Sequence, residues 1–173
     1  MNKLLIILLS SFLVSTAFAQ QIAFETGTWA EIKAKAKKEN KLIFMDAFTT
    51  WCGPCKMMAK NTFTDKAVAD YYNANFINAK IDMEKGEGLD IAKEYKVSCY
   101  PNLVYVDGDG KLVHRAAGSM DPAAFIALGK TAYSPEKAFS AYQNKYDAGE
   151  RNPQFLTAYL DVLSQTCLTT SSV

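Results

Sequence analysis

Two cysteines that stand three positions apart, Cys52 and Cys55, are the residues of this sequence best suited to chemistry. A disulfide between them closes so short a loop that it removes little entropy from the unfolded chain, which argues against a purely structural role. If a helix begins at Cys52, the unpaired N–H groups of its first turn and its dipole stabilise a thiolate there. Cys55, one turn further on, can attack a mixed disulfide on Cys52 and release a reduced substrate. The spacing therefore predicts thiol–disulfide exchange, with Cys52 as the nucleophile and Cys55 as the resolving thiol.

The two residues between the cysteines suit the start of such a helix. Gly53 tolerates a strained backbone at a tight turn, and Pro54 supplies the φ angle of a first helical turn without needing an N–H partner.

A Cys-x-x-Cys pair can also be half of a zinc site, which needs two further ligands. The other cysteines, Cys99 and Cys167, are single and widely separated, and His114 is the one histidine. We expect His114 to be an exposed strand residue, so the sequence predicts no metal site. Cys99 is interpreted as a small buried hydrophobe in preference to a third redox thiol or a regulatory site. Cys167 can pair with another chain, pair with Cys99 or stay free.

The cysteine pair follows an apolar run, residues 41–48, that predicts a central strand buried on both faces. The run contains one acid, Asp46. Burial raises the pKa of a carboxyl group, which brings it into the range for acid–base catalysis near neutral pH. The alternative is an aspartate that faces a solvated edge of the sheet.

The remaining elements predict the frame around this strand. Capping-box spacing at Thr28 and Glu31 indicates a helix up to residue 40. Alternating or apolar runs indicate strands at 76–82, 102–106 and 111–115, with a helix at 89–95 and another that begins at Asp121. Strands that alternate with helices and end in a hairpin predict an α/β fold, in which a central mixed sheet is flanked by helices.

The two ends of the chain differ from this middle part. Lys3, an apolar run at 4–14 and Ala17-Phe18-Ala19 have the pattern of a signal peptide that is cleaved after Ala19. The alternative, a membrane anchor, would need roughly 20 apolar residues. Residues 133–173 predict an α-helical extension, in which Ser134-Pro135 and Asn152-Pro153 each open a helix and Gly149 ends the first. The extension could pack as a helical hairpin or begin a helical repeat.

These patterns predict three parts: a signal peptide at 1–19, a domain at 20–132 and the extension at 133–173. Export places the protein in the periplasm. The formal net charge is +1 for the whole chain, and loss of Lys3 with the signal peptide brings it to 0. A neutral chain gives no indication of a strongly charged partner such as nucleic acid.

Three features together resemble the thioredoxin family over residues 24–132. They are the segment Trp51-Cys52-Gly53-Pro54-Cys55-Lys56, the acid Asp46 six residues before the first cysteine, and the proline Pro101 that opens a later strand. The resemblance implies a thioredoxin fold and a redox-active disulfide that works without a bound cofactor. It also implies that Asp46 assists proton transfer to and from the resolving thiol.

The same resemblance implies a substrate groove. Pro101 matches the cis-proline of the family, with Tyr100, Pro101 and Asn102 beside extended substrate peptides. Trp51 flanks this groove next to Gly53 and Pro54, and its ring offers an apolar platform. Tyr100 is bulkier than the residue common before this proline, and Cys99 precedes it. Lys80 lies on the strand where the family often places a lysine that tunes the buried acid.

A Gly-Pro pair between the cysteines resembles the reducing members of the family. We therefore expect a protein-disulfide reductase that acts on thiols and disulfides of exported client proteins and receives electrons from a membrane-embedded donor. One alternative is a disulfide oxidase or isomerase. Another is a non-catalytic thioredoxin-fold module that binds partners.

Overall fold

The computed structural model describes residues 21–168 of the chain. The expected signal peptide at residues 1–19 lies outside the described residues. Within the described range, no helix has both the length and the apolar character needed to cross a membrane.

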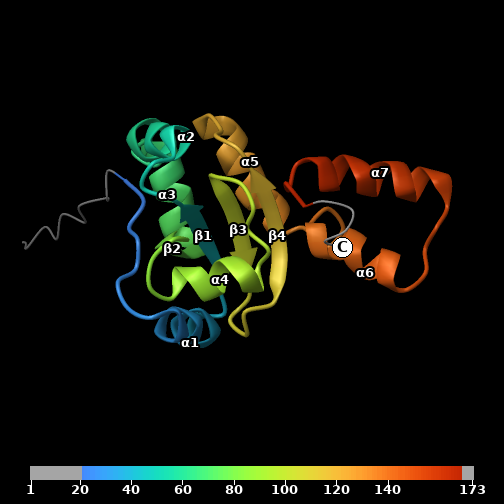
Figure 1. Ribbon diagram of the computed structural model, residues 1–173, viewed down its shortest axis with the longest axis horizontal. Coiled ribbons are helices and arrows are strands. Elements are labelled where there is room, and N and C mark those ends of the chain that lie inside the picture. The colour runs from blue at the N-terminus through green and yellow to red at the C-terminus, as the bar shows by residue number, and fades with distance from the viewer. Residues whose placement is uncertain (1–20, 169–173) are drawn as a thin grey trace, which may run out of the picture.

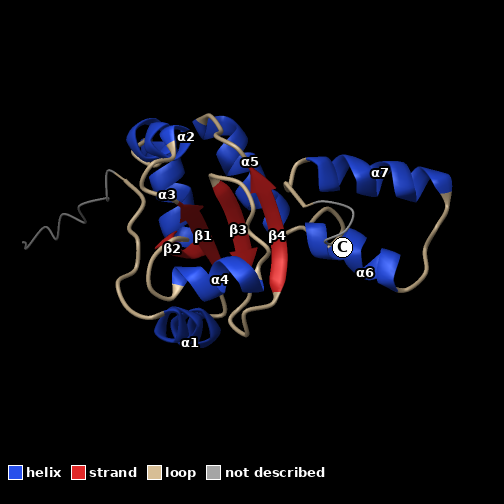
Figure 2. Ribbon diagram, in the orientation of Figure 1, coloured by secondary structure: helices blue, strands red, loops and turns tan. Residues whose placement is uncertain are grey.

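Four strands form one mixed sheet at the centre of the protein (Figures 1 and 2). They are β1 (Leu42–Phe48), β2 (Phe76–Asp82), β3 (Asn102–Val106) and β4 (Leu112–Ala117), in the spatial order β2-β1-β3-β4. β1 runs parallel to β2 and antiparallel to β3, and β3 forms a hairpin with β4. The predicted α/β fold with a mixed sheet is confirmed.

Helices cover both faces of this sheet. α1 (Trp29–Glu39) and α4 (Gly88–Glu94) pack on one face, and α3 (Lys66–Asn75) and α5 (Pro122–Ala132) pack on the other. The short helix α2 (Gly53–Met57) runs into a π-helical segment, η1 (Met58–Thr62), on the α3–α5 side. Because side chains alternate along a strand, β1 sends Phe44 to the α3–α5 face and Ile43 and Met45 to the α1–α4 face.

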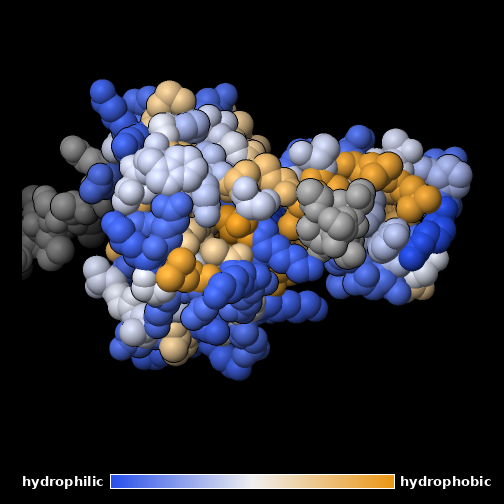
Figure 3. Space-filling model, in the orientation of Figure 1, coloured by the Kyte–Doolittle hydropathy of each residue, from blue (hydrophilic) through white to orange (hydrophobic). Residues whose placement is uncertain are grey.

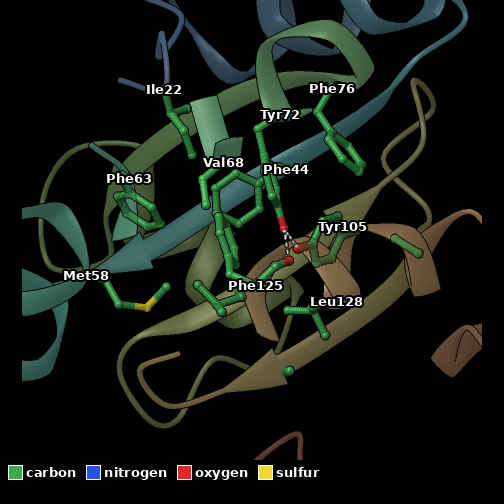
Figure 4. Packing of buried hydrophobic residues seen from close by; sticks show 13 residues of the cluster. Ile22, Phe44, Met58, Phe63, Val68, Tyr72, Phe76, Tyr105, Phe125 and Leu128 are labelled. Atoms are coloured by element: carbon green, nitrogen blue, oxygen red, sulfur yellow. Dashed lines mark hydrogen bonds between the residues drawn. The ribbon is translucent and has the colours of Figure 1, made fainter. Parts of the chain in front are cut away.

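The core on the α3–α5 face is rich in aromatic rings (Figure 4). The rings of Tyr72 and Phe125 stack with their centroids 4.1 Å apart, and Phe44 packs edge-on against both. The Tyr72 hydroxyl donates to the Phe125 carbonyl at 2.7 Å and lies 2.6 Å from the Tyr105 hydroxyl. These bonds satisfy the polar ends of two buried tyrosines, so the rings can fill the core without an unpaired hydroxyl.

The extension consists of α6 (Phe139–Asp147) and α7 (Pro153–Ser164), which project from the sheet edge at β4 (Figure 1). Its own small core is formed by Phe139, Tyr159 and Leu163. Apolar surface also remains along α7 (Figure 3), where Leu160 is 57% exposed. The predicted pair of helices is confirmed, and α7 begins at Pro153 with Asn152 as its cap, as expected.

The start of α6 and the environment of His114 were both predicted wrongly. Residues 135–137 form a turn, and the helix begins only at Phe139, whose backbone N–H donates to His114 Nδ1 at 3.0 Å. His114 is therefore buried, at 6% exposure, instead of facing solvent. The strand pattern could not indicate this, because the covering helix lies beyond α5 in the sequence.

Candidate active site

Cys52 and Cys55 form a disulfide at the N-terminus of α2, directly after β1. Cys52 is the N-cap residue, and its sulfur accepts a hydrogen bond from the backbone N–H of Cys55 at 3.1 Å. Both cysteines are buried in this oxidised state, at 2% exposure each. The same N–H would stabilise a thiolate on Cys52 once the disulfide is reduced.

The residues between the cysteines differ in what they contribute. Pro54 lies in the first turn of α2, as expected. Gly53 does not relieve backbone strain, because it is not among the residues with a positive φ angle. A Cβ atom at Gly53 would meet nothing within 4 Å. The missing side chain of Gly53 instead leaves open the surface next to Cys52.

Asp46 lies inside the protein, at 1% exposure, on the same face of β1 as Phe44. Its Oδ2 atom bonds to Lys80 Nζ, and Oδ1 is buried with no hydrogen-bond partner among the described residues. Burial raises the pKa of Asp46, and the positive charge of Lys80 offsets only part of that effect. A buried carboxyl group with one free oxygen can accept or release a proton.

Lys80 faces Asp46 because of the register between two parallel strands, in which the two residues are direct partners. Its ammonium group also lies 4.3 Å from the centre of the Phe48 ring. The expected contact between Lys80 and the buried acid is confirmed.

Pro101 follows a cis peptide bond from Tyr100 and immediately precedes β3. β1 and β3 are antiparallel with Ala47 opposite Asn102, so the last residues of β1 and the first residues of β3 lie at the same end of the sheet. The cysteine pair and the cis-proline therefore lie at this end, beyond the ends of two neighbouring strands. The predicted cis bond is confirmed, and the groove that it was expected to form remains a prediction.

Trp51 and Tyr100 make an aromatic corner beside the cysteine pair. Their rings meet edge to face, with the centroids 5.9 Å apart. The indole N–H of Trp51 donates to the carboxylate of Glu84 at 3.0 Å, while the ring itself is 65% exposed. Sequence analysis did not identify Glu84. Its position just after β2 could have indicated that it lies near Trp51, because the parallel strands β1 and β2 end at the same end of the sheet.

Cys99 is not the unpaired buried residue that we expected, because it forms a disulfide with Cys167, whose Cα atom lies 6.3 Å away. The chain after α7 returns to the loop before Pro101, where the Ser98 hydroxyl donates to the Cys167 carbonyl at 3.0 Å. Of the three possibilities for Cys167, the structure shows pairing with Cys99. Among residues 21–168, no group of three or more His, Cys, Asp or Glu side chains is arranged to hold a metal ion.

Comparisons with known proteins agree with this geometry. The family model described as "Thioredoxin-like domain" matches residues 29–133. Thioredoxin-2 of Saccharomyces cerevisiae is 40% identical over 85 residues, which are 49% of this chain and 74% of that protein. The solution structure of a candidate disulphide-isomerase from Bacteroides thetaiotaomicron is 44% identical, with a TM-score of 0.59, over 65% of this chain and 93% of that one. A thioredoxin from Thermus thermophilus, at 22% identity and a TM-score of 0.57 over 65% of this chain and 89% of that one, shares the fold.

Proposed function

This chain belongs to the thioredoxin-like domain family, and on that premise we propose that it reduces disulfide bonds in exported client proteins through Cys52 and Cys55. The protein is a thiol–disulfide oxidoreductase. The observation that carries the assignment is the Cys52–Cys55 disulfide at the start of α2, with an N–H group directed at the sulfur of Cys52.

The reaction has two exchange steps. The Cys52 thiolate attacks a sulfur of the client disulfide, and one client thiolate leaves as a mixed disulfide forms on Cys52. Cys55 then loses its proton and attacks the Cys52 sulfur, which releases the second client sulfur as a thiolate and leaves the Cys52–Cys55 disulfide. Asp46 accepts the Cys55 proton, since its Oδ1 atom is unpartnered and its raised pKa favours the protonated form. The redox-active disulfide is the only redox group that this cycle requires.

Client peptides bind beside the cis bond that precedes Pro101. The exposed Trp51 ring and the neighbouring Tyr100 offer apolar surface, and the open surface at Gly53 and Pro54 lets an extended backbone approach Cys52.

The proposed direction of the reaction and the proposed compartment are supported by features of the sequence. The Gly53-Pro54 pair and the similarity to yeast Thioredoxin-2 support a reductase. The signal-peptide pattern at residues 1–19 supports export to the periplasm, where a membrane-embedded donor would return electrons to the Cys52–Cys55 pair.

A disulfide isomerase is the second candidate. It is favoured by the similarity to the candidate disulphide-isomerase from Bacteroides thetaiotaomicron, which covers 93% of that chain. An isomerase has the same first step, but its mixed disulfide persists long enough for the client to rearrange.

The equilibrium reduction potential of Cys52–Cys55 distinguishes these functions. It should be measured in the Cys99→Ser, Cys167→Ser variant, where no other disulfide can form. A reductase should have a reduction potential of about −270 mV, the value characteristic of thioredoxin, and an isomerase should have a reduction potential of about −180 mV. A potential close to about −120 mV would indicate a strong oxidant and contradict the proposal.

A further inference from the structure

The second disulfide, Cys99–Cys167, lies at the edge of the candidate active site. Cys99 is two positions before Pro101 and next to Tyr100, whose ring contacts Trp51. Cys167 is exposed to solvent, whereas Cys99 is partly buried. Cys167, as the more exposed of the two residues, is therefore the one that we expect a thiolate from solvent to attack.

Polar groups next to Cys99 are arranged to stabilise negative charge on its sulfur. The side-chain amide of Asn102 donates to Cys99 Sγ at 3.8 Å. The same amide accepts, through Oδ1, a hydrogen bond from the Arg115 guanidinium at 3.0 Å. Arg115 is 2% exposed, and no carboxylate of the described residues pairs with it. A buried cation that polarises the amide makes Cys99 the better leaving group of the two cysteines.

Few other bonds hold the end of the extension on the domain. After α7, Gln165 accepts a hydrogen bond from Ala117 N–H at 2.7 Å, and Cys167 accepts one from Ser98. The Cys99–Cys167 bond is the covalent link in this region, and it connects positions 68 residues apart. Its opening would release the end of the extension from the loop that leads to the cis-proline.

We propose that Cys99–Cys167 is a second redox-active disulfide, which a dithiol opens by attack on Cys167 with Cys99 as the leaving thiolate. This function goes beyond the reduction of clients by Cys52 and Cys55. A donor thiolate bonds to Cys167 Sγ, the Sγ–Sγ bond breaks, and its electron pair leaves on Cys99, which then takes a proton from water. The second donor thiolate attacks the donor sulfur of the mixed disulfide and frees Cys167. The donor is oxidised to a disulfide, and this protein gains two electrons and two protons.

The experiment uses the full chain with Cys52→Ser and Cys55→Ser, in which Cys99–Cys167 is the remaining disulfide. The folded protein is exposed to dithiothreitol without denaturant, its free thiols are alkylated, and peptides that contain Cys99 and Cys167 are quantified by mass spectrometry. A parallel sample receives glutathione, a monothiol that leaves a mixed disulfide on the sulfur it attacks. A third receives the reduced Cys99→Ser, Cys167→Ser chain, which tests whether the Cys52–Cys55 pair of a second copy is the donor.

The expected result is opening in the folded state, with glutathione found on Cys167 in excess over Cys99. The matched variant Asn102→Asp keeps the size of the side chain and an acceptor for Arg115 but removes the donor to Cys99. The Cys99–Cys167 disulfide of this variant should open about tenfold more slowly than that of the Cys52→Ser, Cys55→Ser parent. The reason is that the leaving thiolate of Cys99 loses its hydrogen bond and faces a carboxylate. Circular dichroism of the parent and of its Asn102→Asp variant checks that the fold is retained in both.

Opening only after denaturant is added, an adduct mainly on Cys99, or an Asn102→Asp variant as fast as its parent would each overturn the proposal. If dithiothreitol opens Cys99–Cys167, the sample with the reduced Cys99→Ser, Cys167→Ser chain identifies the donor. Opening in that sample assigns the donor to a second copy of this protein, and no opening there assigns it to another dithiol. The proposed reductase function is tested in the Cys99→Ser, Cys167→Ser variant and the second disulfide in the Cys52→Ser, Cys55→Ser variant. A failure of one proposal is therefore distinguishable from a failure of the other.

Discussion

The carboxyl group of Asp46 shows how one residue can be unfavourable for stability and useful for chemistry. It is almost completely buried, and only one of its two oxygens has a hydrogen-bond partner among the described residues. Such a group costs free energy when ionised, because a single contact with Lys80 replaces only part of its hydration. The same burial raises the pKa of Asp46, which suits the group to the proton transfer that we propose for it.

Replacement of Asp46 by Asn should slow the second exchange step. An amide cannot accept the Cys55 proton, so turnover of a disulfide substrate at neutral pH should fall by about tenfold or more, while the first attack by Cys52 changes less. Stopped-flow measurement of both steps with a disulfide peptide tests this expectation. Equal slowing of the first and second steps would argue that Asp46 acts on Cys52 instead.

The same substitution should stabilise the protein above acidic pH. The folded-state pKa of Asp46 is raised above its ordinary value of 3.8, so the native state retains a proton that the unfolded chain releases. The contribution of this group to stability is therefore complete below pH 3.8 and is lost as the pH rises through the folded-state pKa. Asp46→Asn should raise the melting temperature at pH 8 and have little effect at pH 3. A lower melting temperature at pH 8 would show that the Lys80 contact outweighs burial.

At the scale of elements, the junction between β4 and α6 depends on one imidazole. His114 Nδ1 accepts the N–H of Phe139, which requires the ring to be neutral with its proton on Nε2. Burial lowers the pKa of His114 to about 4. Protonation puts a hydrogen on Nδ1, and the bond that begins α6 is then lost.

Acid should therefore loosen the extension before it affects the sheet. The unfolded chain binds a proton at His114 below about pH 6.5, whereas the native state binds it only near pH 4, so stability falls as the pH is lowered through this window. The total effect is at most about 3–4 kcal/mol. Hydrogen exchange at pH 7 and pH 5 should show α6 losing protection while β1 keeps it. His114→Asn, whose side chain also accepts a hydrogen bond, should remove the difference between the two pH values, and an unchanged difference would assign it to another group.

At the scale of the whole molecule, the protein has cores of very different size. The sheet is covered by a large apolar cluster on each face, whereas the apolar cluster in the described part of the extension has three buried members, Phe139, Tyr159 and Leu163. Stability within a protein follows the number of buried apolar contacts, so the domain should retain its structure when the extension opens.

Two phenylalanine substitutions test this division. Phe125→Ala removes a fully buried ring that stacks on Tyr72, and urea unfolding of the domain should show a loss of about 3–5 kcal/mol. Phe155→Ala, a matched change in the partly buried periphery of the extension, should leave domain unfolding within about 0.5 kcal/mol of the parent. Similar losses in both variants would mean that the extension and the domain unfold as one unit.

The sequence by itself was sufficient wherever the physics is local. A cysteine pair at a helix start and the cap at Thr28 depend on neighbours within a few positions, and an apolar run of the length of β1 is itself the signal of a buried strand. The structure has all three. The position of the cis-proline was predictable because its order relative to the cysteines carried the family resemblance.

Only the tertiary structure decided which distant side chains meet. The pairing of Cys99 with Cys167, the burial of His114 and the bond between Trp51 and Glu84 each join residues far apart in the chain. The pattern along one strand or helix does not contain the path of the segment that returns to cover it. The first two contacts exist because the extension folds back on the domain, and the third because β1 and β2 end side by side. Each placement is set by packing between elements and not by the preferences of any one of them.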